Sequence, residues 1–527
     1  MLTCNRHLNY APPVKKQHLE GHFSAPPNTG KSPVHNCNCD FYYGTDIVAG
    51  QQLISNLSMR SLILLLLTAL MSCDSARPVS WSATAITDVT VIDAINGVRH
   101  NQTVIFSGDE ITAIEPTVKN PVNHHIIDGT GKFLIPGLWD FHVHLTYEPE
   151  LIALMPRLFL AYGITSVRDT GGLLRDIVPV VQKMQKPEAI APRVFFAGPL
   201  LDGSDVVYDG KSRPEIGVQN ATKQQARTTI ETLKAAGASF IKIYELVSEE
   251  VFFEMVAVAR ALDMPIDSHV PLSMLASIAG PEVDSIEHLR NIELDCATNA
   301  DELHRQRLLA LKNPQGLPGY EVRSALHKAQ RLPAITAYDE DRCTEVLAKL
   351  TKTLQVPTLR LNALQKYPPF SRDDWQQALS RIPDGMSLRW QAIADTLEKA
   401  EESDTRFAEW SLFLTGKMHQ QGVPIGAGTD TPIRLSVPGY SLHSELEMLV
   451  LAGLTPLQAI AAATIEPAKY FSIEHSMGQI AKGMKADLVL LEHDPLKNIK
   501  HTKAIALVVS KGTVMTPDEI LSSADRQ

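Results

Sequence analysis

Short apolar segments alternate with amphipathic helical patterns through the middle of the 527-residue sequence, and this alternation constrains the fold most strongly. Strands separated by helices pair in parallel, because each helix returns the chain to the same end of the sheet. Periodicity predicts eight strands, at residues 139–144, 164–168, 193–197, 240–244, 265–269, 285–288, 356–359 and 424–430. Eight such strand–helix units are typical of a (β/α)₈ TIM barrel in the α/β class.

Polar side chains stand at the ends of these strands, where a barrel of this kind has its active site. In the first strand a period of two places two imidazoles on the same face. Neutral imidazoles and carboxylates are good ligands for Zn²⁺-like ions. The pattern therefore predicts a metal site. Its candidate residues are His142, His144, Lys242, His269, His288 and Asp430.

Each of these residues also has a structural explanation of its own. A His-x-His triplet occurs by chance in surface strands. Lys242 can form a salt bridge or extend its ammonium group to solvent, and Asp430 can cap the next helix. Single buried histidines are more often satisfied core residues than ligands. The metal-site hypothesis depends on all of these residues falling at strand ends together.

The same residues resemble the metal pattern of the amidohydrolase superfamily, which has His-x-His on strand one, Lys on strand four, His on strands five and six, and Asp on strand eight. The resemblance extends from about residue 83 to residue 513. Within the superfamily the sequence is similar to imidazolonepropionase-like and prolidase-like amidohydrolases. The stretches that carry the resemblance are 136–144, 427–431, 452–456, 463–464 and 483–489.

The resemblance implies a binuclear site with two divalent metal ions. Zn²⁺ is the first choice, and Mn²⁺, Fe²⁺ or Co²⁺ are alternatives. By analogy with the family, His142, His144 and Asp430 bind the more buried metal, and His269 and His288 bind the more exposed one.

The family also implies a role for Lys242. Carboxylation of its amine by CO₂ gives a carbamate that bridges both metals, whereas an unmodified lysine leaves a one-metal site. A metal-bridged hydroxide then attacks the substrate carbonyl, and Asp430 passes the proton to the leaving nitrogen. The expected function is hydrolysis of non-peptide or cyclic amide carbon–nitrogen bonds. The alternatives are an Xaa-Pro-type (prolidase-like) dipeptidase, an esterase or lactonase, and a non-catalytic surface binding protein on the same barrel.

The residues that select the substrate are less clearly marked in the sequence. Arg168, Tyr244 and Arg434 are candidates for binding a substrate carboxylate, although an ordinary surface ion pair explains each arginine equally well. Two helical, charge-rich insertions, 295–355 and 362–423, leave from the same face of the predicted barrel. They predict either a lid over the site or a solvated helical rim.

The two ends of the globular region have a different pattern from its centre. Short strand-like segments separated by turn residues occupy 83–135 and return at 476–515. We expect these two pieces to form one small β-sandwich. The barrel then occupies residues 136–470.

The amino-terminal region predicts export of the protein. Residues 1–58 lack periodic hydrophobicity and are interpreted as an upstream or disordered extension. Residues 59–73 have the short basic start, apolar stretch and small residues of a signal peptide with a bacterial lipobox, which makes Cys73 the lipidation site. With Met59 as the start, the protein is a periplasmic or membrane-attached lipoprotein. Only Cys296 and Cys343 follow Cys73, so no disulfide framework is expected.

The overall composition limits the class of partner. The formal net charge is −10, and 44% hydrophobic with 20% charged residues is ordinary for a soluble globular protein. There is no long basic block, which argues against nucleic acid as a partner. The expected partner is a small amide or a dipeptide, and self-association into a homo-oligomer is a further option.

Overall fold

The computed structural model describes residues 83–117, 124–211, 213–313, 315–399 and 404–522. The predicted extension (1–58), the signal peptide (59–73) and the lipidation site Cys73 lie outside the described residues. Among the helices of the described ranges, none combines the length and the apolar character needed to cross a membrane.

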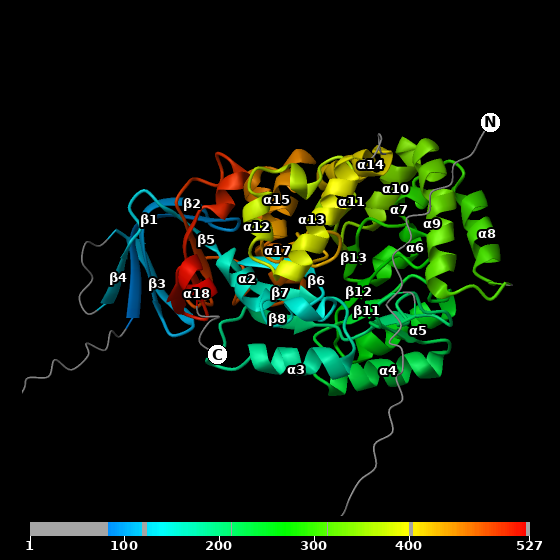
Figure 1. Ribbon diagram of the computed structural model, residues 1–527, viewed down its shortest axis with the longest axis horizontal. Helices are drawn as coiled ribbons and strands as arrows, with labels where there is room; N and C mark the ends of the chain where they lie inside the picture. The colour runs from blue at the N-terminus through cyan, green and yellow to red at the C-terminus, as the bar shows by residue number, and fades with distance from the viewer. Residues whose placement is uncertain (1–82, 118–123, 212, 314, 400–403, 523–527) are drawn as a thin grey trace, which may run out of the picture. The chain divides into compact units, whose positions relative to one another are not determined.

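A three-stranded and a six-stranded sheet of short parallel strands form the centre of the fold (Figure 1). Their strand orders are β6-β7-β8 and β10-β9-β11-β12-β13-β14. The strands of the first sheet are β6 (Leu138–Val143), β7 (Ile164–Asp169) and β8 (Arg193–Phe196). Those of the second are β9 (Leu200–Asp202), β10 (Gly217–Gln219), β11 (Ile241–Ile243), β12 (Ile266–Ser268), β13 (Ser285–Glu287) and β14 (Leu354–Val356).

Individual backbone contacts connect the two sheets. The amide of Ser239 donates to the carbonyl of Phe196 (2.8 Å), which places the chain entering β11 beside β8. Residues 424–431 run alongside β14 and β6, with parallel bridges to Gln355 and to Val143. The arrangement is a TIM-barrel-like α/β fold, as predicted. The regular strands nevertheless form two sheets rather than one closed eight-stranded barrel.

The last two predicted strands differ from the observed ones. The segment predicted at 356–359 is regular only as β14, which ends at Val356, because Pro357 has no amide donor and Thr358 is left-handed with φ 47°. Residues 424–430 form no regular strand and contain one bridging residue. The β9–β10 pair was not predicted, because three-residue strands are too short to show alternation.

Helices between the strands bury an aliphatic core against the sheets. On α4, for example, Ile230 and Leu233 are buried, and on α5 Phe252 and Met255 are buried. The helices that follow the early strands are α2 (Met155–Ala161), α3 (Leu174–Met184), α4 (Lys223–Ala235), α5 (Glu249–Ala261) and α6 (Ala276–Ala279). Those that follow residue 431 are α15 (Tyr440–Leu451), α16 (Pro456–Ala462) and α17 (Ile465–Tyr470). Short 3₁₀ turns are η1 (Pro149–Leu151), η2 (Gly280–Glu282), η3 (Pro369–Ser371) and η4 (Ile499–Lys503).

Both long insertions are helical in the structure. The helices between β13 and β14 are α7 (Ile292–Asp295), α8 (Ala300–Ala310), α9 (Gly319–Thr336) and α10 (Glu340–Lys349). Those between β14 and residue 424 are α11 (Leu359–Asn362), α12 (Trp375–Leu379), α13 (Asp384–Glu398) and α14 (Arg406–Gln420). The first insertion reaches the candidate site described below through α9.

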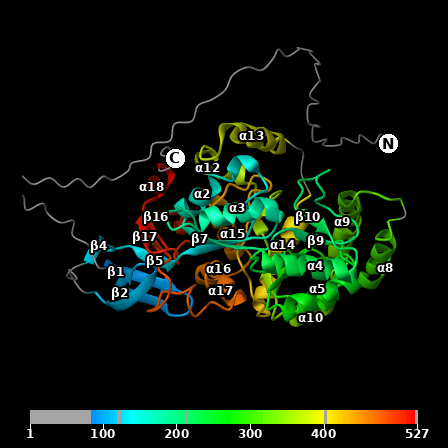
Figure 2. The same cartoon turned by 90° about the horizontal axis from the view of Figure 1, so that it is seen from below.

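The two ends of the described chain share one sheet of eight strands, in the order β17-β16-β15-β5-β1-β2-β3 with β4 beside β1 (Figures 1 and 2). The amino-terminal strands are β1 (Ala83–Asp93), β2 (Gly97–Ser107), β3 (Glu110–Pro116), β4 (His124–Asp128) and β5 (Phe133–Pro136). The carboxyl-terminal elements are β15 (Leu488–Leu491), β16 (Ile505–Ser510), β17 (Thr513–Met515) and α18 (Pro517–Ser522). The two ends meet where β5 pairs antiparallel with β15. The division of this sheet into a two-layered sandwich stays a prediction.

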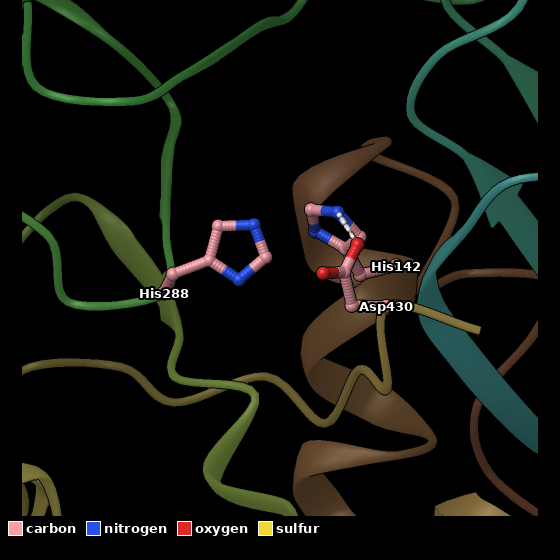
Figure 3. A group of neighbouring side chains, drawn as sticks. All are labelled: His142, His288 and Asp430. Carbon is pink, nitrogen blue, oxygen red and sulfur yellow. Dashed lines mark ion pairs between the residues drawn. The ribbon is translucent and has the colours of Figure 1, made fainter. Parts of the chain in front are cut away.

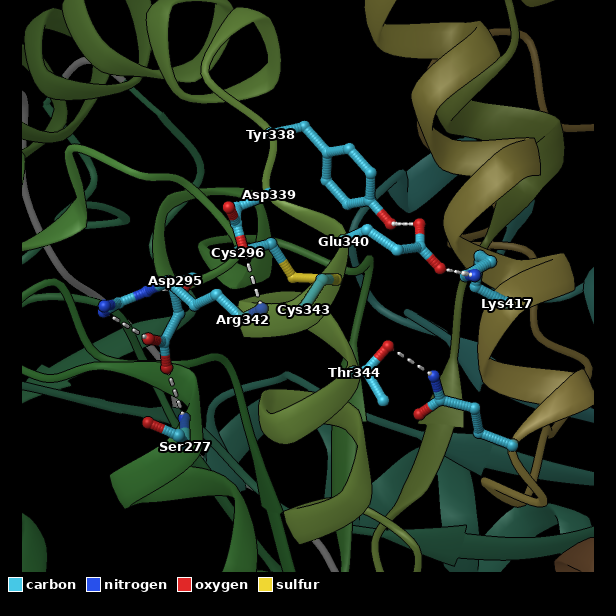
Figure 4. The surroundings of a disulfide bond; sticks show 11 residues. Ser277, Asp295, Cys296, Tyr338, Asp339, Glu340, Arg342, Cys343, Thr344 and Lys417 are labelled. Carbon is cyan, nitrogen blue, oxygen red and sulfur yellow. Dashed lines mark hydrogen bonds and ion pairs between the residues drawn. A yellow bond between two sulfur atoms is a disulfide. The ribbon is translucent and has the colours of Figure 1, made fainter.

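A disulfide joins Cys296 to Cys343, a single bridge in a chain whose sequence predicted no disulfide framework (Figure 4). Both cysteines are fully buried. The backbone around them is tied by an antiparallel bridge between Ala297 and Tyr338. The bond closes a loop with a sequence separation of 47 residues, which contains α8 and α9. Two isolated cysteines so far apart give no sequence signal, because their pairing depends on the tertiary fold.

We expect loss of this disulfide to destabilise the protein. A crosslink that closes a loop of this length removes conformational entropy from the unfolded chain, and its loss typically costs about 2–4 kcal/mol. Cys296→Ala/Cys343→Ala should therefore unfold at a lower urea concentration than the wild type, and added reductant should have no further effect on the variant. An unchanged unfolding midpoint would contradict the prediction.

Candidate metal centre

All six predicted metal-site residues line a single cavity at the ends of the central strands. They come from β6 and the residue after it, from β11, from the residues that follow β12 and β13, and from the segment 424–431. None of the six is more than 5% exposed. Other described residues of the wall are Leu200, Tyr208, Ile216, Tyr244, Arg290 and Ile433.

Asp430 lies between the histidines of this cavity. Its Oδ1 is 3.2 Å from Nε2 of His142 and 3.2 Å from Nε2 of His144. On its other side lies His288, and potential ligand atoms of His142, His288 and Asp430 all fall within 4.8 Å of one another (Figure 3). The rings of His288 and His269 are 4.9 Å apart between centroids, which continues the row of imidazoles. One carboxylate therefore faces a group of closely spaced nitrogen ligands.

All four histidines are held through the same ring nitrogen. In each of them Nδ1 is hydrogen-bonded to an oxygen of the protein, which fixes the ring and leaves Nε2 available. The partners are Glu287 for His142, the carbonyl of Gly171 for His144 (3.1 Å), Glu245 for His269 (2.9 Å) and Thr358 for His288 (2.7 Å). Such partners are typical of metal-binding histidines, whose remote nitrogen is bonded to a carboxylate or carbonyl.

Arg168 does not line the cavity, which corrects its assignment as a substrate contact. It is fully buried, and its guanidinium lies 3.8 Å from the centre of the Phe141 ring. Its Nε donates to the carbonyl of Phe141 (2.7 Å), and Nη1 donates to Ser285 (3.0 Å). Nη2 donates to Glu287 (2.5 Å), the carboxylate that holds His142. Arg168 therefore orients the partner of a candidate ligand.

Of the other two predicted substrate contacts, one lies at the site and one does not. Tyr244 lines the cavity and packs against His269, with ring centroids 4.5 Å apart. Arg434 is exposed, and its carbonyl accepts a hydrogen bond from Arg360 (2.9 Å). Arg434 therefore contacts Arg360 through its backbone carbonyl, and its guanidinium does not line the cavity.

Glu245 was missed by the sequence reasoning. It is fully buried and accepts hydrogen bonds from Arg323 (3.0 and 2.9 Å), from His327 and from Arg290 (3.2 Å) while it holds His269. Arg323 and His327 belong to α9 of the first insertion. Glu245 directly follows Tyr244 at the end of β11, and its position at a strand end was the signal that could have identified it.

Lys242 is the candidate ligand that fits least well as an unmodified side chain. It is 1% exposed, and its Nζ lies 3.0 Å from Oδ2 of Asp267. Yet among the described residues neither of these two atoms has a hydrogen-bond partner. An ammonium group buried in this way is costly. An ammonium group would also repel a metal ion, so Lys242 fits a site that binds cations only after its amine has lost the positive charge.

Burial and charge together set the protonation of these groups. Burial opposes protonation of His142, but the charges of Glu287 and Asp430 outweigh it and raise its pKa to about 9. Burial would raise the pKa of Asp430, but His288, His142 and His144 hold it well below its usual range. Burial, reinforced by Lys242, lowers the pKa of His269 to about 4. The site thus favours an ionised Asp430 and a neutral His269.

Strained backbone accompanies the site. His288 has φ 62°, Thr358 has φ 47° and Asp430 has φ 60°, a left-handed conformation that is uncommon for residues other than glycine. Strain of this kind persists only where the surrounding structure enforces it, and it concentrates at functional sites. The loop after Thr358 is enforced by Glu445, whose carboxylate accepts from the amides of Leu359 (2.9 Å) and Arg360 (2.7 Å).

Glu445 gives a prediction about pH dependence. Burial raises its pKa from 4.5 to about 8, although bonds from the Arg360 and Leu359 amides oppose this. The folded state therefore binds this proton more tightly than the unfolded chain does. Between pH 4.5 and about pH 8, the ordinary and the raised pKa of Glu445, each unit of pH should therefore lower the free energy of unfolding by about 1.4 kcal/mol.

Urea unfolding of the wild type and of Glu445→Gln, measured from pH 5 to pH 8, tests this expectation. The wild type should lose stability more steeply as the pH rises. Some slope should remain in the variant, because burial also raises the pKa of Asp202 to about 7. Parallel pH profiles of the two proteins would exclude Glu445 as a titrating group.

Comparison with known proteins finds matches to parts of this chain. Residues 414–515 match the model of the amidohydrolase family. An adenine deaminase from Clostridium botulinum (strain Loch Maree / Type A3) is 32% identical over 117 residues, which is 22% of this chain and 18% of that protein. Ochratoxinase from Aspergillus niger is 41% identical over 81 residues, 15% of this chain and 16% of that protein. The matched stretches thus span less than a fifth of these relatives.

The fold is similar to that of a solved Xaa-Pro dipeptidase with methionine bound in its active site. The TM-score is 0.59 at 18% sequence identity, and the alignment covers 82% of this chain and 100% of the dipeptidase. The family match over residues 414–515 agrees with the resemblance to the amidohydrolase superfamily that the sequence predicted, and the structural likeness shows that the fold is similar to that of this dipeptidase.

Proposed function

We propose that this protein is a metal-dependent amidohydrolase that hydrolyses carbon–nitrogen bonds of small non-peptide or cyclic amides. The observation that carries the proposal is the set of four histidines, each anchored through Nδ1, that line one cavity together with the carboxylate of Asp430. Two of these histidines, His142 and His144, also have Nε2 3.2 Å from Oδ1 of Asp430, an arrangement that a merely structural histidine does not need.

Two divalent metal ions, Zn²⁺ in the first place, fit this donor set. His142, His144 and Asp430 would hold one of them, and His269 and His288 the other. Carboxylation of Lys242 would supply the bridging ligand and would remove the cost of its buried ammonium group. When bound, the metals supply Lewis-acid activation of water and of the substrate carbonyl.

The side chains of the chain then perform the proton transfers. Asp430 is ionised and accepts the proton of the attacking water as general base. The same carboxylic acid then donates that proton to the leaving nitrogen. Glu287, Glu245, Gly171 and Thr358 keep the imidazoles fixed, so that the site does not reorganise during the reaction.

Two other functions could use the same fold. A prolidase-like dipeptidase uses the same chemistry on a different substrate, and likeness in fold to an Xaa-Pro dipeptidase keeps this alternative open. The names of the curated relatives, an adenine deaminase and an ochratoxinase, favour small organic substrates. A non-catalytic binding protein has no need of a carboxylate poised between imidazoles, so the presence of Asp430 argues against it.

Substitution of Asp430 tests the mechanism. We expect Asp430→Asn, loaded with Zn²⁺ or Mn²⁺ and bicarbonate, to retain metal and lose about 10²–10⁴-fold in turnover, since general acid–base catalysis contributes that much. The substrate panel contains N-acyl amino acids, dipeptides, cyclic amides and lactones. The control is Asp404→Asn, an exposed carboxylate paired with Arg406. Metal analysis and a carbamate ¹³C signal from labelled bicarbonate provide readouts that do not depend on activity.

The outcomes of this experiment separate the candidate functions. Turnover that survives in Asp430→Asn removes this residue from the mechanism. Metal-loaded wild type that cleaves nothing on the panel favours the binding protein. Cleavage of proline-containing dipeptides alone favours the prolidase-like alternative.

We also propose that the chain is exported and attached to a membrane by a lipid on Cys73, with Met59 as its start. The disulfide between Cys296 and Cys343 supports an oxidising compartment. Mass spectrometry of the protein from its native source should find a lipid-modified amino terminus at Cys73. Detection of any peptide from residues 1–58 would contradict this prediction.

A further inference from the structure

Arg290 is the one arginine among the described residues that line the candidate metal cavity. It follows His288 by two residues, so the end of β13 delivers a candidate ligand and a guanidinium to the same cavity. Its side chain is 17% exposed, and Nη1 lies 3.2 Å from Oε1 of Glu245. That contact uses one donor of the guanidinium fork, which has five.

Glu245 does not neutralise Arg290, because another arginine already shares it. Arg323 donates to the same oxygen through Nε (3.0 Å) and Nη2 (2.9 Å). Two guanidinium groups on one carboxylate leave an excess positive charge at this side of the cavity. Glu245 therefore positions Arg290 without cancelling its attraction for an anion.

Apart from Arg290 and the six candidate ligands, the described residues that line the cavity are apolar or aromatic. Leu200, Ile216 and Ile433 line it together with Tyr208 and Tyr244, whose ring centroids are 5.8 Å apart. A charge-assisted hydrogen bond is stronger in such surroundings than in open water. A planar guanidinium also matches a carboxylate in a two-point geometry that an ammonium group cannot provide.

We propose that Arg290 determines specificity by binding a carboxylate of the substrate, so that the preferred substrates are amides bearing a free carboxylate rather than neutral cyclic amides. The proposal rests on the hydrolase function inferred above and narrows its substrate class. In this proposal Arg290 takes the place of Arg168 and Arg434, which the sequence predicted as carboxylate contacts.

Matched pairs of substrates test this assignment. The first pair is N-acetyl-L-phenylalanine and N-acetyl-L-phenylalaninol. Both have the same scissile amide, but the first carries a carboxylate where the second carries a hydroxymethyl group. The second pair is N-acetyl-L-proline and N-acetyl-L-prolinol. We expect the wild type to prefer the acid in kcat/KM by about 10- to 100-fold, the usual effect of a charged hydrogen bond. Arg290→Gln should lose this preference, and Arg290→Lys should keep part of it.

The control variant is Arg305→Gln, which removes an exposed arginine of the first insertion whose guanidinium pairs with Glu302 on α8. It should keep the wild-type preference. Thermal shift with N-acetyl-L-phenylalanine provides a second readout, since the acid should stabilise the metal-loaded wild type more than Arg290→Gln. Metal content and melting temperature without ligand check that each variant is folded and loaded.

Failure of this proposal can be distinguished from failure of the proposed function. Equal kcat/KM for acid and alcohol in the wild type, or a preference that survives in Arg290→Gln, overturns the assignment of Arg290 while hydrolysis stands. Absence of any hydrolysis, together with stabilisation by the acid that Arg290→Gln abolishes, overturns the hydrolase and supports the carboxylate contact. If the protein neither hydrolyses these substrates nor is stabilised by the acid, the assignment of Arg290 as a carboxylate contact is overturned.

Discussion

The buried ion pair between Arg168 and Glu287 is the interaction on which the candidate site depends. A guanidinium and a carboxylate withdrawn from water are costly unless every polar atom finds a partner. Arg168 meets this condition through Phe141, Ser285 and Glu287, and its face rests on an aromatic ring. Glu287 in turn holds His142. The orientation of a candidate ligand is therefore fixed by charges inside the core and not by a mobile loop.

A second buried carboxylate, Glu245, also fixes a candidate ligand, and it connects that ligand to the first insertion. Glu245 holds His269 on one side and receives Arg323 and His327 from α9 on the other. The first insertion thus contributes to the electrostatics of the cavity even though its side chains are not candidate metal ligands. Closure of a lid is not needed for this contribution, because the contacts already exist in the structure. The insertion and the central strands share one buried network of charges.

Much of the fold and the set of cavity residues could be predicted from the sequence, because both follow from patterns within short segments of the chain. Strand periodicity and the rule that barrel sites lie at strand ends are enough to identify His142, His144, Lys242, His269, His288 and Asp430. The contacts of Arg168 could not be predicted, since nothing in its own strand reveals whether it faces the cavity or the core. Glu245 and Arg323 lie 78 residues apart, and their pairing depends on how an insertion packs. The disulfide and the left-handed Thr358 depend on tertiary structure in the same way.

The pairing of β5 with β15 has a consequence for the order in which the protein is made. Ribosomes release the amino-terminal strands first, and their partner emerges only after the whole barrel-like region has been synthesised. Until then β5 presents unpaired backbone groups, which invite pairing with other chains. Contacts so distant in sequence also form slowly. A nascent chain of this protein therefore needs protection during synthesis, and residues 488–515 complete a sheet that the amino-terminal strands began.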